Sequence, residues 1–386
     1  MKNVGVIGLG KRIGRVVGNI LWAETDEVKV SAVTDINKEK IEHAVNMRPE
    51  MYKDDMRVYS DADKMLENEK LDGVFVGTNC DTHTDFAVKV IEKGIPLFLE
   101  KPVSTTMDDL IKLKNAMTEY NPKVMVSFPR RYSGIATLAK EIIDSGKIGT
   151  VEQVQAFNDV PYGRVYYHDW FRNDTVTGGM WLQKATHDLD CINYITGMKP
   201  VEICAMESKQ IFKGDKPVGL TCSNCPEYNT CCESPKLIGK RYADRILGDM
   251  CSFAQDTGNH DSGSAIIRYE SGMHAVYSQN FFARKKAGRR GARYYGYKGT
   301  LEFDWVKAEI KVYMHNTDRV DTYRFEGSES SHFGGDAIMI SDFMDMLEGR
   351  GSSILKEGIE SALMCIKARE SCQTGSFVKI PDVNSL

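Results

Sequence analysis

The segment NVGVIGLGKRIGRVV places Gly8 and Gly10 where a buried apolar strand passes into a helix. Glycines at such a turn let the backbone bend tightly and let a pyrophosphate approach the free amides at the helix N-terminus. The pattern therefore predicts a dinucleotide site. The usual fingerprint has a third glycine where this chain has Ile13, followed by Gly14. From this departure we expect a helix packing shifted by one residue, or a longer loop.

Strands and helices alternate over the first third of the chain. Such an alternation predicts an α/β fold, with a doubly wound parallel sheet of the Rossmann type. We assign this domain to residues 1–122. The expected strands cover residues 3–8, 28–35, 71–77, 95–100 and 123–128, and the expected helices cover residues 12–24, 37–47, 82–94 and 107–120.

The remaining chain has longer strands in which apolar and polar residues alternate. This period of two is typical of antiparallel strands with one exposed face, so we expect an α+β domain over residues 123–386 with a large, mostly antiparallel sheet. The expected strands cover residues 150–157, 201–209, 263–270, 272–282, 292–305, 309–315 and 319–325. The expected helices cover about 133–146, 183–196, 336–349 and 355–371.

Bulk properties exclude several classes of protein. A chain of 386 residues is long enough for two cores, and a cleft between them is expected. Its net charge of −4 gives no broad positive field for a nucleic acid. The sequence has no apolar run long enough for a membrane helix and no signal-peptide pattern at Met1, so we expect a cytoplasmic protein.

Asp35 ends the second predicted strand, where an acidic side chain can accept hydrogen bonds from both hydroxyls of the adenosine ribose. A carboxylate there repels a 2′-phosphate and favours NAD over NADP. Lys11 and Arg12, beside the glycine turn, and Lys38 keep NADP open as the cofactor. The alternative for Asp35 is that it only caps the next helix.

Two further strand ends face the same edge of the predicted sheet. The first, GTNCDTH, carries Thr78, Asn79 and His83, which we expect beside the cofactor's ribose and pyrophosphate. The second ends in Glu100 and Lys101, and we expect both near the cofactor as well.

Several longer motifs carry a family resemblance. They are LEKP at 99–102, SFPRRY at 127–132, SGKIGTVEQV at 145–154, the stretch WFRNDTVTGGMWLQKATHDLDCINYITG at 170–197, and GYKGTLEF at 296–303. Because these motifs occur together in this order, the chain resembles the glucose-fructose oxidoreductase/inositol dehydrogenase/MocA family. The resemblance implies an oxidoreductase that binds a nicotinamide dinucleotide and acts on a sugar-like molecule.

The resemblance also implies roles for single residues. Lys101 would lie beside the nicotinamide and the substrate, where an ammonium can stabilise a developing alkoxide. His187 would be the histidine at the start of a second-domain helix, and Trp170 and Arg172 would belong to a loop over the nicotinamide.

One position departs from better-known members of that family, which have an aspartate four residues before the histidine. This chain has Gln183 there, followed by Lys184, and a carboxamide cannot take a proton. Lys101 and Lys184 would lower each other's pKa, and the positive charge of an oxidised nicotinamide would lower both. This would move the pKa of Lys184 towards the range of a general base. We therefore expect Lys101, Lys184 and His187 to be catalytic, and which of them is the base stays open.

A cysteine cluster lies in an insertion at about 215–255. Cys222 and Cys225 are separated by two residues, and further cysteines follow them. This is the spacing of tetrahedral thiolate ligands, which suits a closed structural zinc site. A disulfide or free thiols are the alternatives. The candidate ligands are Cys222, Cys225, Cys231, Cys232 and Cys251.

The leading function is NAD-dependent hydride transfer at a secondary hydroxyl or ketone of a sugar, sugar derivative or cyclitol. A second hypothesis is an NAD-dependent glycoside hydrolase, which oxidises the sugar transiently, eliminates the substituent and reduces the product again. A third is a silent sensor that binds NAD without turnover. The resemblance further implies a homodimer or homotetramer that associates through the broad sheet.

Overall fold

The computed structural model describes residues 1–21, 25–239, 241–242, 245–326 and 329–386. The chain forms two compact units. The first comprises Met1–Ala136, Gly327–Leu363 and Pro381–Leu386, and the second comprises Thr137–Glu326 and Met364–Ile380. This division differs from the one expected at residues 122 and 123, because two late segments return to the first unit.

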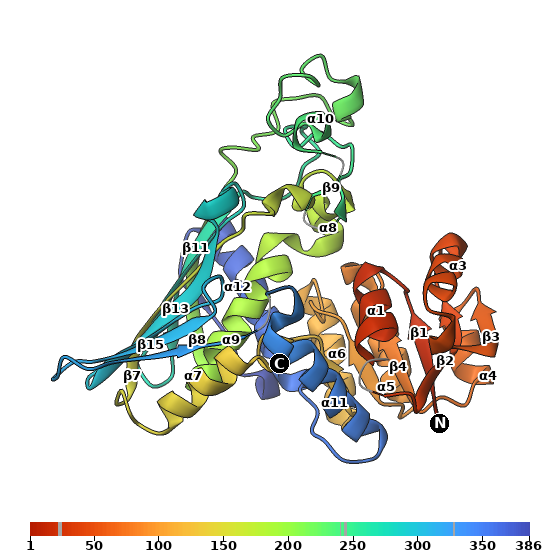
Figure 1. Ribbon diagram of the computed structural model, residues 1–386, viewed down its shortest axis with the longest axis horizontal. Helices are drawn as coiled ribbons and strands as arrows, with labels where there is room; N and C mark the ends of the chain where they lie inside the picture. Colours follow the sequence, from red (N-terminus) through yellow and green to blue (C-terminus); the bar gives the residue numbers. More distant parts are fainter. Residues whose placement is uncertain (22–24, 240, 243–244, 327–328) are drawn as a thin grey trace. The chain divides into compact units, whose positions relative to one another are not determined.

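The first unit is built on six parallel strands in the order β3-β2-β1-β4-β5-β6 (Figure 1). The order reverses between β1 and β4, and ligands of such sheets bind at the carboxyl ends of the strands beside that reversal. The strands are β1 (Lys2–Ile7), β2 (Val28–Thr34), β3 (Tyr52–Tyr59), β4 (Gly73–Val76), β5 (Leu97–Leu99) and β6 (Val124–Val126).

Helices cover this sheet, and one of them comes from the end of the chain. Helix α11 (Gly335–Leu347) buries Met339, Ile340 and Phe343 in the same core as Phe75 and Phe98 of the strands. We expected this helix in the second domain, so that assignment is corrected. The other helices are α1 (Lys11–Arg15), α3 (Lys38–Met47), α4 (Ala62–Asn68), α5 (His83–Glu92), α6 (Met107–Tyr120) and the first part of α12 (Leu355–Thr374).

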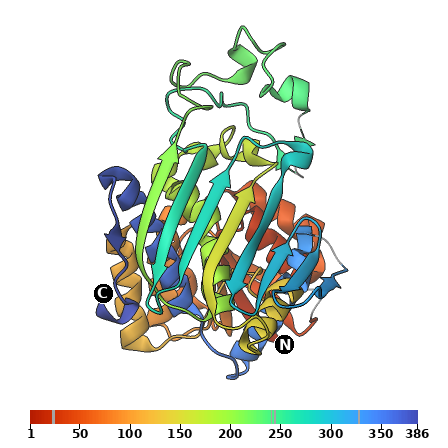
Figure 2. The same ribbon diagram turned by 90° about the vertical axis from the view of Figure 1, so that its left-hand side faces the viewer.

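The second unit is built on nine strands in the order β16-β15-β14-β13-β7-β12-β11-β8-β17, and Figure 2 shows one broad face of this sheet. All neighbours are antiparallel except β7 and β12. The strands are β7 (Val151–Asp159), β8 (Pro200–Ser208), β11 (Ser262–Tyr269), β12 (His274–Asn280), β13 (Arg289–Gly296), β14 (Gly299–Asp304), β15 (Glu309–Met314), β16 (Val320–Arg324) and β17 (Val378–Lys379).

Helix α9 (Thr186–Thr196) is tied to the sheet of the second unit by polar contacts. The hydroxyl of Tyr277 donates to Asp188 over 2.9 Å, and that of Tyr269 donates to Asn193 over 2.9 Å. A π-helical turn, Trp181–Ala185, leads into the helix. The remaining elements are α7 (Gly134–Asp144), α8 (Asp174–Thr177), α10 (Pro235–Ile238) and a small hairpin of β9 (Arg241–Tyr242) and β10 (Arg245–Ile246).

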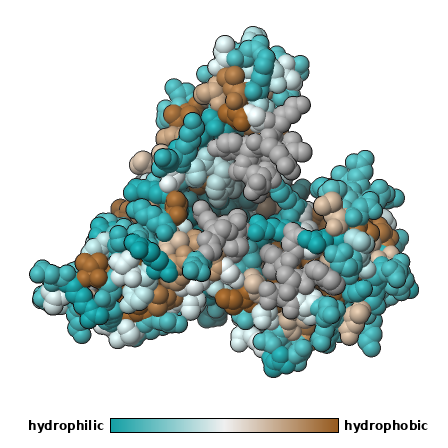
Figure 3. Space-filling view, viewed as in Figure 1, coloured by the Kyte–Doolittle hydropathy of each residue, from teal (hydrophilic) through white to brown (hydrophobic). Residues whose placement is uncertain are grey.

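The expected fold class is confirmed, since a parallel α/β sheet is followed by a large, mostly antiparallel one. The described surface in Figure 3 is mainly hydrophilic, with single apolar residues scattered over it. No helix in the described ranges combines the length and the apolar character that a membrane crossing needs.

Candidate functional site

The glycine turn after β1 has a backbone that requires glycine. Gly8 has a φ of +81°, and a Cβ on it would lie 2.7 Å from the backbone nitrogen of Thr78. A Cβ on Gly10 would lie 3.3 Å from the carbonyl oxygen of Gly77. The strand end at Gly77 and Thr78 therefore approaches the turn so closely that a side chain at Gly8 would be both strained and blocked.

Ile13 replaces the third glycine without lengthening the loop. Gly14 already donates a helical hydrogen bond to the carbonyl of Gly10 over 2.8 Å, so the helix begins directly after the turn. The side chain of Ile13 is fully buried and fills the space over Gly77. The turn is not lengthened as expected, because the glycine that the fingerprint places on the helix is found instead at Gly77, on the facing strand end.

Asp35 supports the turn from the end of β2. One carboxylate oxygen accepts the amide of Leu9 over 2.7 Å, and the other accepts the amide of Asn37 over 2.8 Å. Asn37, not Asp35, caps α3, because its side chain accepts the amide of Lys40. The simple capping role for Asp35 is therefore excluded. Each carboxylate oxygen still has lone pairs for a ribose hydroxyl.

Arg12 faces two carboxylates on its own unit. Its guanidinium lies 2.6 Å from Asp336 and 3.2 Å from Glu100, and both acids are buried. Burial lowers the pKa of Arg12, but Glu100 and Asp336 outweigh it and raise the pKa above its ordinary value. Arg12 and Glu100 thus neutralise each other, whereas we expected both to contact the cofactor. Lys11, at the first position of α1, is exposed.

His332 completes this cluster; from the sequence, the pair of His332 and Asp336 could be a substrate contact, with loop structure as the favoured interpretation. Its Nδ1 lies 2.8 Å from Asp336. Burial opposes ionisation of Asp336, but His332 and Arg12 outweigh it and lower its pKa to about 2. Burial also lowers the pKa of His332 to about 4. No spacing in the sequence points to the contact between Arg12 and Asp336, because these residues lie 324 positions apart.

His83 joins the two other strand ends. Its Nδ1 lies 2.8 Å from the carbonyl oxygen of Pro102, and its Nε2 lies 3.2 Å from that of Thr78. The ring is buried, and burial lowers its pKa, so the imidazole is neutral at pH 7. Because both ring nitrogens face backbone carbonyls, His83 positions Thr78 and the segment around Lys101, and does not itself present a nitrogen to a cofactor. The expected direct contact is corrected accordingly.

Thr78, Asn79 and Lys101 remain at the carboxyl edge of the first sheet, where the sequence predicted them. Asn79 precedes a short 3-10 turn, and its carbonyl accepts the hydroxyl of Thr82 over 2.8 Å. Thr78 is partly exposed. Lys101 follows β5 directly after Glu100 and is half-buried.

In the second unit, Lys184 is covered by aromatic rings. Only 6% of the residue is exposed, and its Nζ donates to the hydroxyl of Tyr162 over 2.7 Å. The same nitrogen lies 4.6 Å from the ring centre of Tyr162 and 5.4 Å from that of Tyr166. Tyr162 itself is half-buried. Of these two side chains in contact, Tyr162 is thus the more exposed.

The charge of Lys184 is opposite to what a general base needs. Burial lowers its pKa, but the hydroxyls of Tyr162 and Tyr166 outweigh burial and the nearby Arg290, so the pKa is raised. We expected a lowered pKa from neighbouring positive charge. The structure reverses that expectation, because the nearest polar groups are phenols that favour the ammonium.

His187 lies in the first turn of α9, three residues after Lys184. Its neighbour Asp188 anchors the helix: one carboxylate oxygen accepts Asn158 over 2.8 Å, and the other lies 2.6 Å from the guanidinium of Arg290. Both charged residues are buried. Gln183 is buried as well and donates to the carbonyl of Thr177 over 3.1 Å.

Trp170 and Arg172 lie in one 3-10 turn but differ in exposure. Trp170 is 42% exposed and stacks on Phe171 with ring centres 4.1 Å apart. Arg172 is buried and donates to Asp256 over 3.0 Å and to Thr257 over 2.5 Å. Burial lowers its pKa. Arg172 is thus part of the loop's interior, and only Trp170 keeps the open surface that a cofactor contact needs.

The five clustered cysteines are free thiols, and the expected zinc site is not supported. Within the described ranges, no group of three or more His, Cys, Asp or Glu side chains is arranged to hold a metal ion. Burial, followed by the charge of neighbouring thiols, raises the pKa of Cys222 to about 12. Burial likewise raises the pKa of Cys231 and Cys251, while Cys225 is half-buried and Cys232 is exposed.

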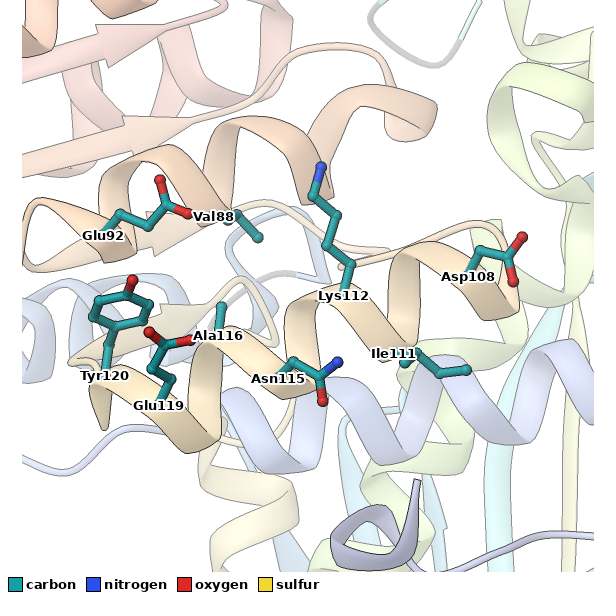
Figure 4. Close-up of a pocket in the computed structure, with 9 residues that line it drawn as sticks. All are labelled: Val88, Glu92, Asp108, Ile111, Lys112, Asn115, Ala116, Glu119 and Tyr120. Carbon is teal, nitrogen blue, oxygen red and sulfur yellow. The ribbon is translucent and has the colours of Figure 1, made fainter.

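A shallow hollow of about 400 Å³ lies along α5 and α6 (Figure 4). It is lined by Val88 and Glu92 of α5 and by residues of α6 that include Lys112 and Tyr120. No predicted site residue lines it. The chemistry predicted from the sequence therefore belongs elsewhere, at the strand ends of the first unit and the start of α9 in the second.

Comparison with protein families gives two matches that follow each other along the chain. Residues 2–128 match the profile of an oxidoreductase family described as having an NAD-binding Rossmann fold. Residues 137–302 match the profile of the GFO/IDH/MocA C-terminal domain.

Curated proteins give matches of the same kind. The chain is 27% identical over 317 residues to the oxidoreductase YteT of Bacillus subtilis, which is 72% of this chain and 73% of that protein. It is 25% identical over 315 residues to myo-inositol 2-dehydrogenase of Thermotoga maritima, covering 81% and 87%.

Solved structures share the fold over the full length. A levoglucosan dehydrogenase in complex with NADH and L-sorbose superposes with a TM-score of 0.78 at 18% identity, and all of both chains is covered. Myo-inositol 2-dehydrogenase of Lactobacillus plantarum superposes with a TM-score of 0.72 at 18% identity, covering 98% and 99%.

Proposed function

Since the chain belongs to the Gfo/Idh/MocA family of oxidoreductases, we propose that it oxidises a secondary hydroxyl of a sugar, sugar derivative or cyclitol with NAD, or catalyses the reverse reduction. The observation that carries the proposal is the glycine turn, where a Cβ at Gly8 would lie 2.7 Å from the backbone of Thr78. When bound, the nicotinamide accepts or returns a hydride at C4.

The residues around this turn suit the dinucleotide. A helix begins directly after Gly10, and the N-terminal amides of a helix suit a pyrophosphate. Asp35 offers its carboxylate to the adenosine ribose from the end of β2. Ile36, directly after it, is fully exposed and gives an adenine ring an apolar surface.

We propose NAD as the preferred cofactor for two electrostatic reasons. Asp35 repels a 2′-phosphate, and Arg12 is already paired with Glu100 and Asp336, so that it is not free to bind one. Lys11 is the exposed cation beside the turn, but its ammonium lacks the fork of donors that fits a phosphate bidentately.

Two of the three predicted catalytic residues keep the roles first proposed for them. The ammonium of Lys101 would hydrogen-bond the substrate hydroxyl and stabilise negative charge on its oxygen as the hydride leaves. The imidazole of His187, half-buried at the start of α9, would bind a neighbouring hydroxyl. Lys184, held as an ammonium behind Tyr162, does not fit a base.

The substrate class is proposed from the relatives together with the site. One of them is an inositol dehydrogenase, and one structural neighbour is a levoglucosan dehydrogenase that holds a sugar. Such molecules share vicinal secondary hydroxyls on a ring. No feature of the described residues favours glycoside hydrolysis over simple oxidation.

We also propose a homodimer or homotetramer that associates through the open face of the second sheet. Met206, Ile266 and Val276 on neighbouring strands are 76%, 47% and 36% exposed and lie on one face. An Ile266→Asp variant should run as a smaller species than the wild type in size-exclusion chromatography with light scattering. An unchanged mass would contradict this interface.

The activity is tested with purified protein, NAD or NADP, and a panel of inositols, aldoses and anhydrosugars, by following the absorbance of reduced nicotinamide. We expect turnover with at least one polyol and with NAD preferred. Lys101→Ala should lose at least about 100-fold in kcat while still binding NAD. Release of the aglycone from an aryl glycoside without added cofactor and without net reduction would replace oxidation by hydrolysis as the reaction.

A further inference from the structure

We propose that Tyr162 exchanges the proton of the substrate hydroxyl, and that Lys184 acts through it by keeping a positive charge beside the phenol oxygen. This inference rests on the proposed oxidoreductase function and assigns the acid–base group within it. The sequence alone favoured Lys184, His187 or Lys101 for this role.

Tyr162 is in direct contact with Lys184 and is the more exposed of the two residues. The Nζ of Lys184 donates to the Tyr162 hydroxyl over 2.7 Å and lies 4.6 Å from the ring centre, so the two groups are in direct contact. Lys184 is 6% exposed, whereas Tyr162 is half-buried. Tyr162 is therefore the more accessible of the two groups.

The electrostatics favour this division of labour. Lys184 keeps its proton, because burial is outweighed by the phenols of Tyr162 and Tyr166. A fixed ammonium that donates a hydrogen bond stabilises a phenolate more than a phenol. Burial lowers the pKa of Arg290, but Asp188 and then Tyr162 outweigh burial and raise that pKa, so Arg290 stays charged and paired with Asp188. The same contacts do not single out Tyr166, because it is buried at 6% exposure.

The proton transfer balances with hydride transfer. In oxidation, the Tyr162 phenolate takes the hydroxyl proton, so that an O–H bond breaks on the substrate and one forms on the phenol. The electron pair left on oxygen forms the carbonyl bond, while the hydride leaves carbon for the nicotinamide. In reduction, the phenol gives the proton back. Lys184 remains protonated in both directions.

The first experiment needs no substrate and no cofactor. The ultraviolet phenolate absorbance of the wild type is titrated with pH beside that of Tyr162→Phe, so that the difference isolates one tyrosine. We expect this difference to appear below the pH of about 10 at which a free tyrosine ionises. In Lys184→Met the same phenol should titrate at a higher pH. If Tyr162 ionises no earlier with Lys184 than without it, the proposal is overturned.

The second experiment measures kcat and KM over pH. Tyr162→Phe should lower kcat by about 10²- to 10³-fold, the usual contribution of a general acid or base, with KM little changed. Lys184→Met should move the acid limb of kcat to higher pH, and Lys184→Arg should restore it in part. Loss of activity in Lys184→Met with an unmoved limb would mean that the lysine only supports the structure.

Tyr323→Phe is the matched control. Lys147 donates to the Tyr323 hydroxyl over 3.3 Å and lies 5.8 Å from its ring centre, so this pair repeats the same contact on the edge strand β16. We expect wild-type kcat for this variant. Comparable losses in Tyr323→Phe and Tyr162→Phe would point to a general effect of removing a lysine–tyrosine bond and would refute the assignment.

The two proposals fail in different ways. If the wild type turns over no polyol, the oxidoreductase function fails, but the substrate-free titration still tests the Tyr162–Lys184 contact. If the wild type is active and Tyr162→Phe retains its kcat, the function stands and the assignment of Tyr162 is wrong.

Discussion

Ile13 and Gly77 occupy one space: a Cβ on Gly77 would lie 2.0 Å from Cγ1 of Ile13. The glycine that most dinucleotide turns place on the helix is found here on the facing strand end. The close approach of helix and strand is therefore preserved by an exchange of side chains across the contact.

Gly77→Ala should destabilise the protein by about 1–3 kcal/mol, the usual cost of overpacking, because the buried Ile13 has no room to move. Ile13→Ala in the same chain should recover part of that loss. Urea unfolding would measure both. Gly14→Ala is the control, since nothing lies within 4 Å of its Cβ position and a helical alanine is favoured over glycine. Equal losses at Gly77 and Gly14 would contradict the contact.

Asp35→Asn should relax the choice between NAD and NADP. The amide oxygen keeps one acceptor for the turn, while the charge that repels a 2′-phosphate is removed. We expect the ratio of kcat/KM for NADP to that for NAD to rise by at least about tenfold, which corresponds to 1.4 kcal/mol. Lys64→Gln, an exposed change on α4, should leave the ratio unaltered. An unchanged ratio in Asp35→Asn would exclude Asp35 from the ribose site.

Asp336 should make stability depend on acid pH. Its pKa is about 2 in the folded chain, below its ordinary value of 3.8, so its charge stabilises the fold above pH 3.8 and this contribution disappears as pH falls through about 2. The shift corresponds to about 2 kcal/mol. Asp336→Asn should therefore be less stable than the wild type at pH 7, and the gap in denaturant unfolding should close towards pH 2. A gap independent of pH would argue against an ionised Asp336.

Arg290 and Arg289 are neighbours in β13, and their substitution should destabilise the protein to very different extents. Removing buried Arg290 leaves the buried charge of Asp188 without its arginine partner. Arg290→Met should therefore lower the free energy of unfolding by about 3–5 kcal/mol. Arg289 is 59% exposed and pairs with Asp159 over 2.7 Å, so Arg289→Met should cost no more than about 1 kcal/mol. Urea unfolding of the two variants checks the difference, and similar costs would contradict the buried pair.

Much of the fold was predictable because its strands are apolar and regularly spaced. The expected strand at 28–35 appears as Val28–Thr34, and that at 309–315 appears as Glu309–Met314. The edge strand β3 was missed, since KDDMR at its centre has no apolar run and is mostly exposed. An edge strand packs against one neighbour only, so its sequence carries little of the signal.

The site was predictable where a motif fixes the backbone, and less so where contacts join distant residues. Gly8, Asp35 and Thr78 lie at the strand ends as expected. The partner of Arg12 on α11, and that of Asp188 on β13, follow from tertiary packing that no local spacing encodes. Lys184 illustrates the consequence: the sequence suggested repulsion by Lys101 and the nicotinamide, but the groups around it in space are phenols.

The return of α11 to the first sheet has a consequence for how the chain folds during synthesis. Phe343 contacts Phe75 and Phe98 at ring-centre distances of 5.1 and 5.6 Å, and a Cβ on Gly73 would meet Leu347 at 2.6 Å. The N-terminal strands leave the ribosome long before these partners exist. Until the last segments are translated, aromatic surface stays uncovered, and a nascent chain of this kind is a natural client for chaperones.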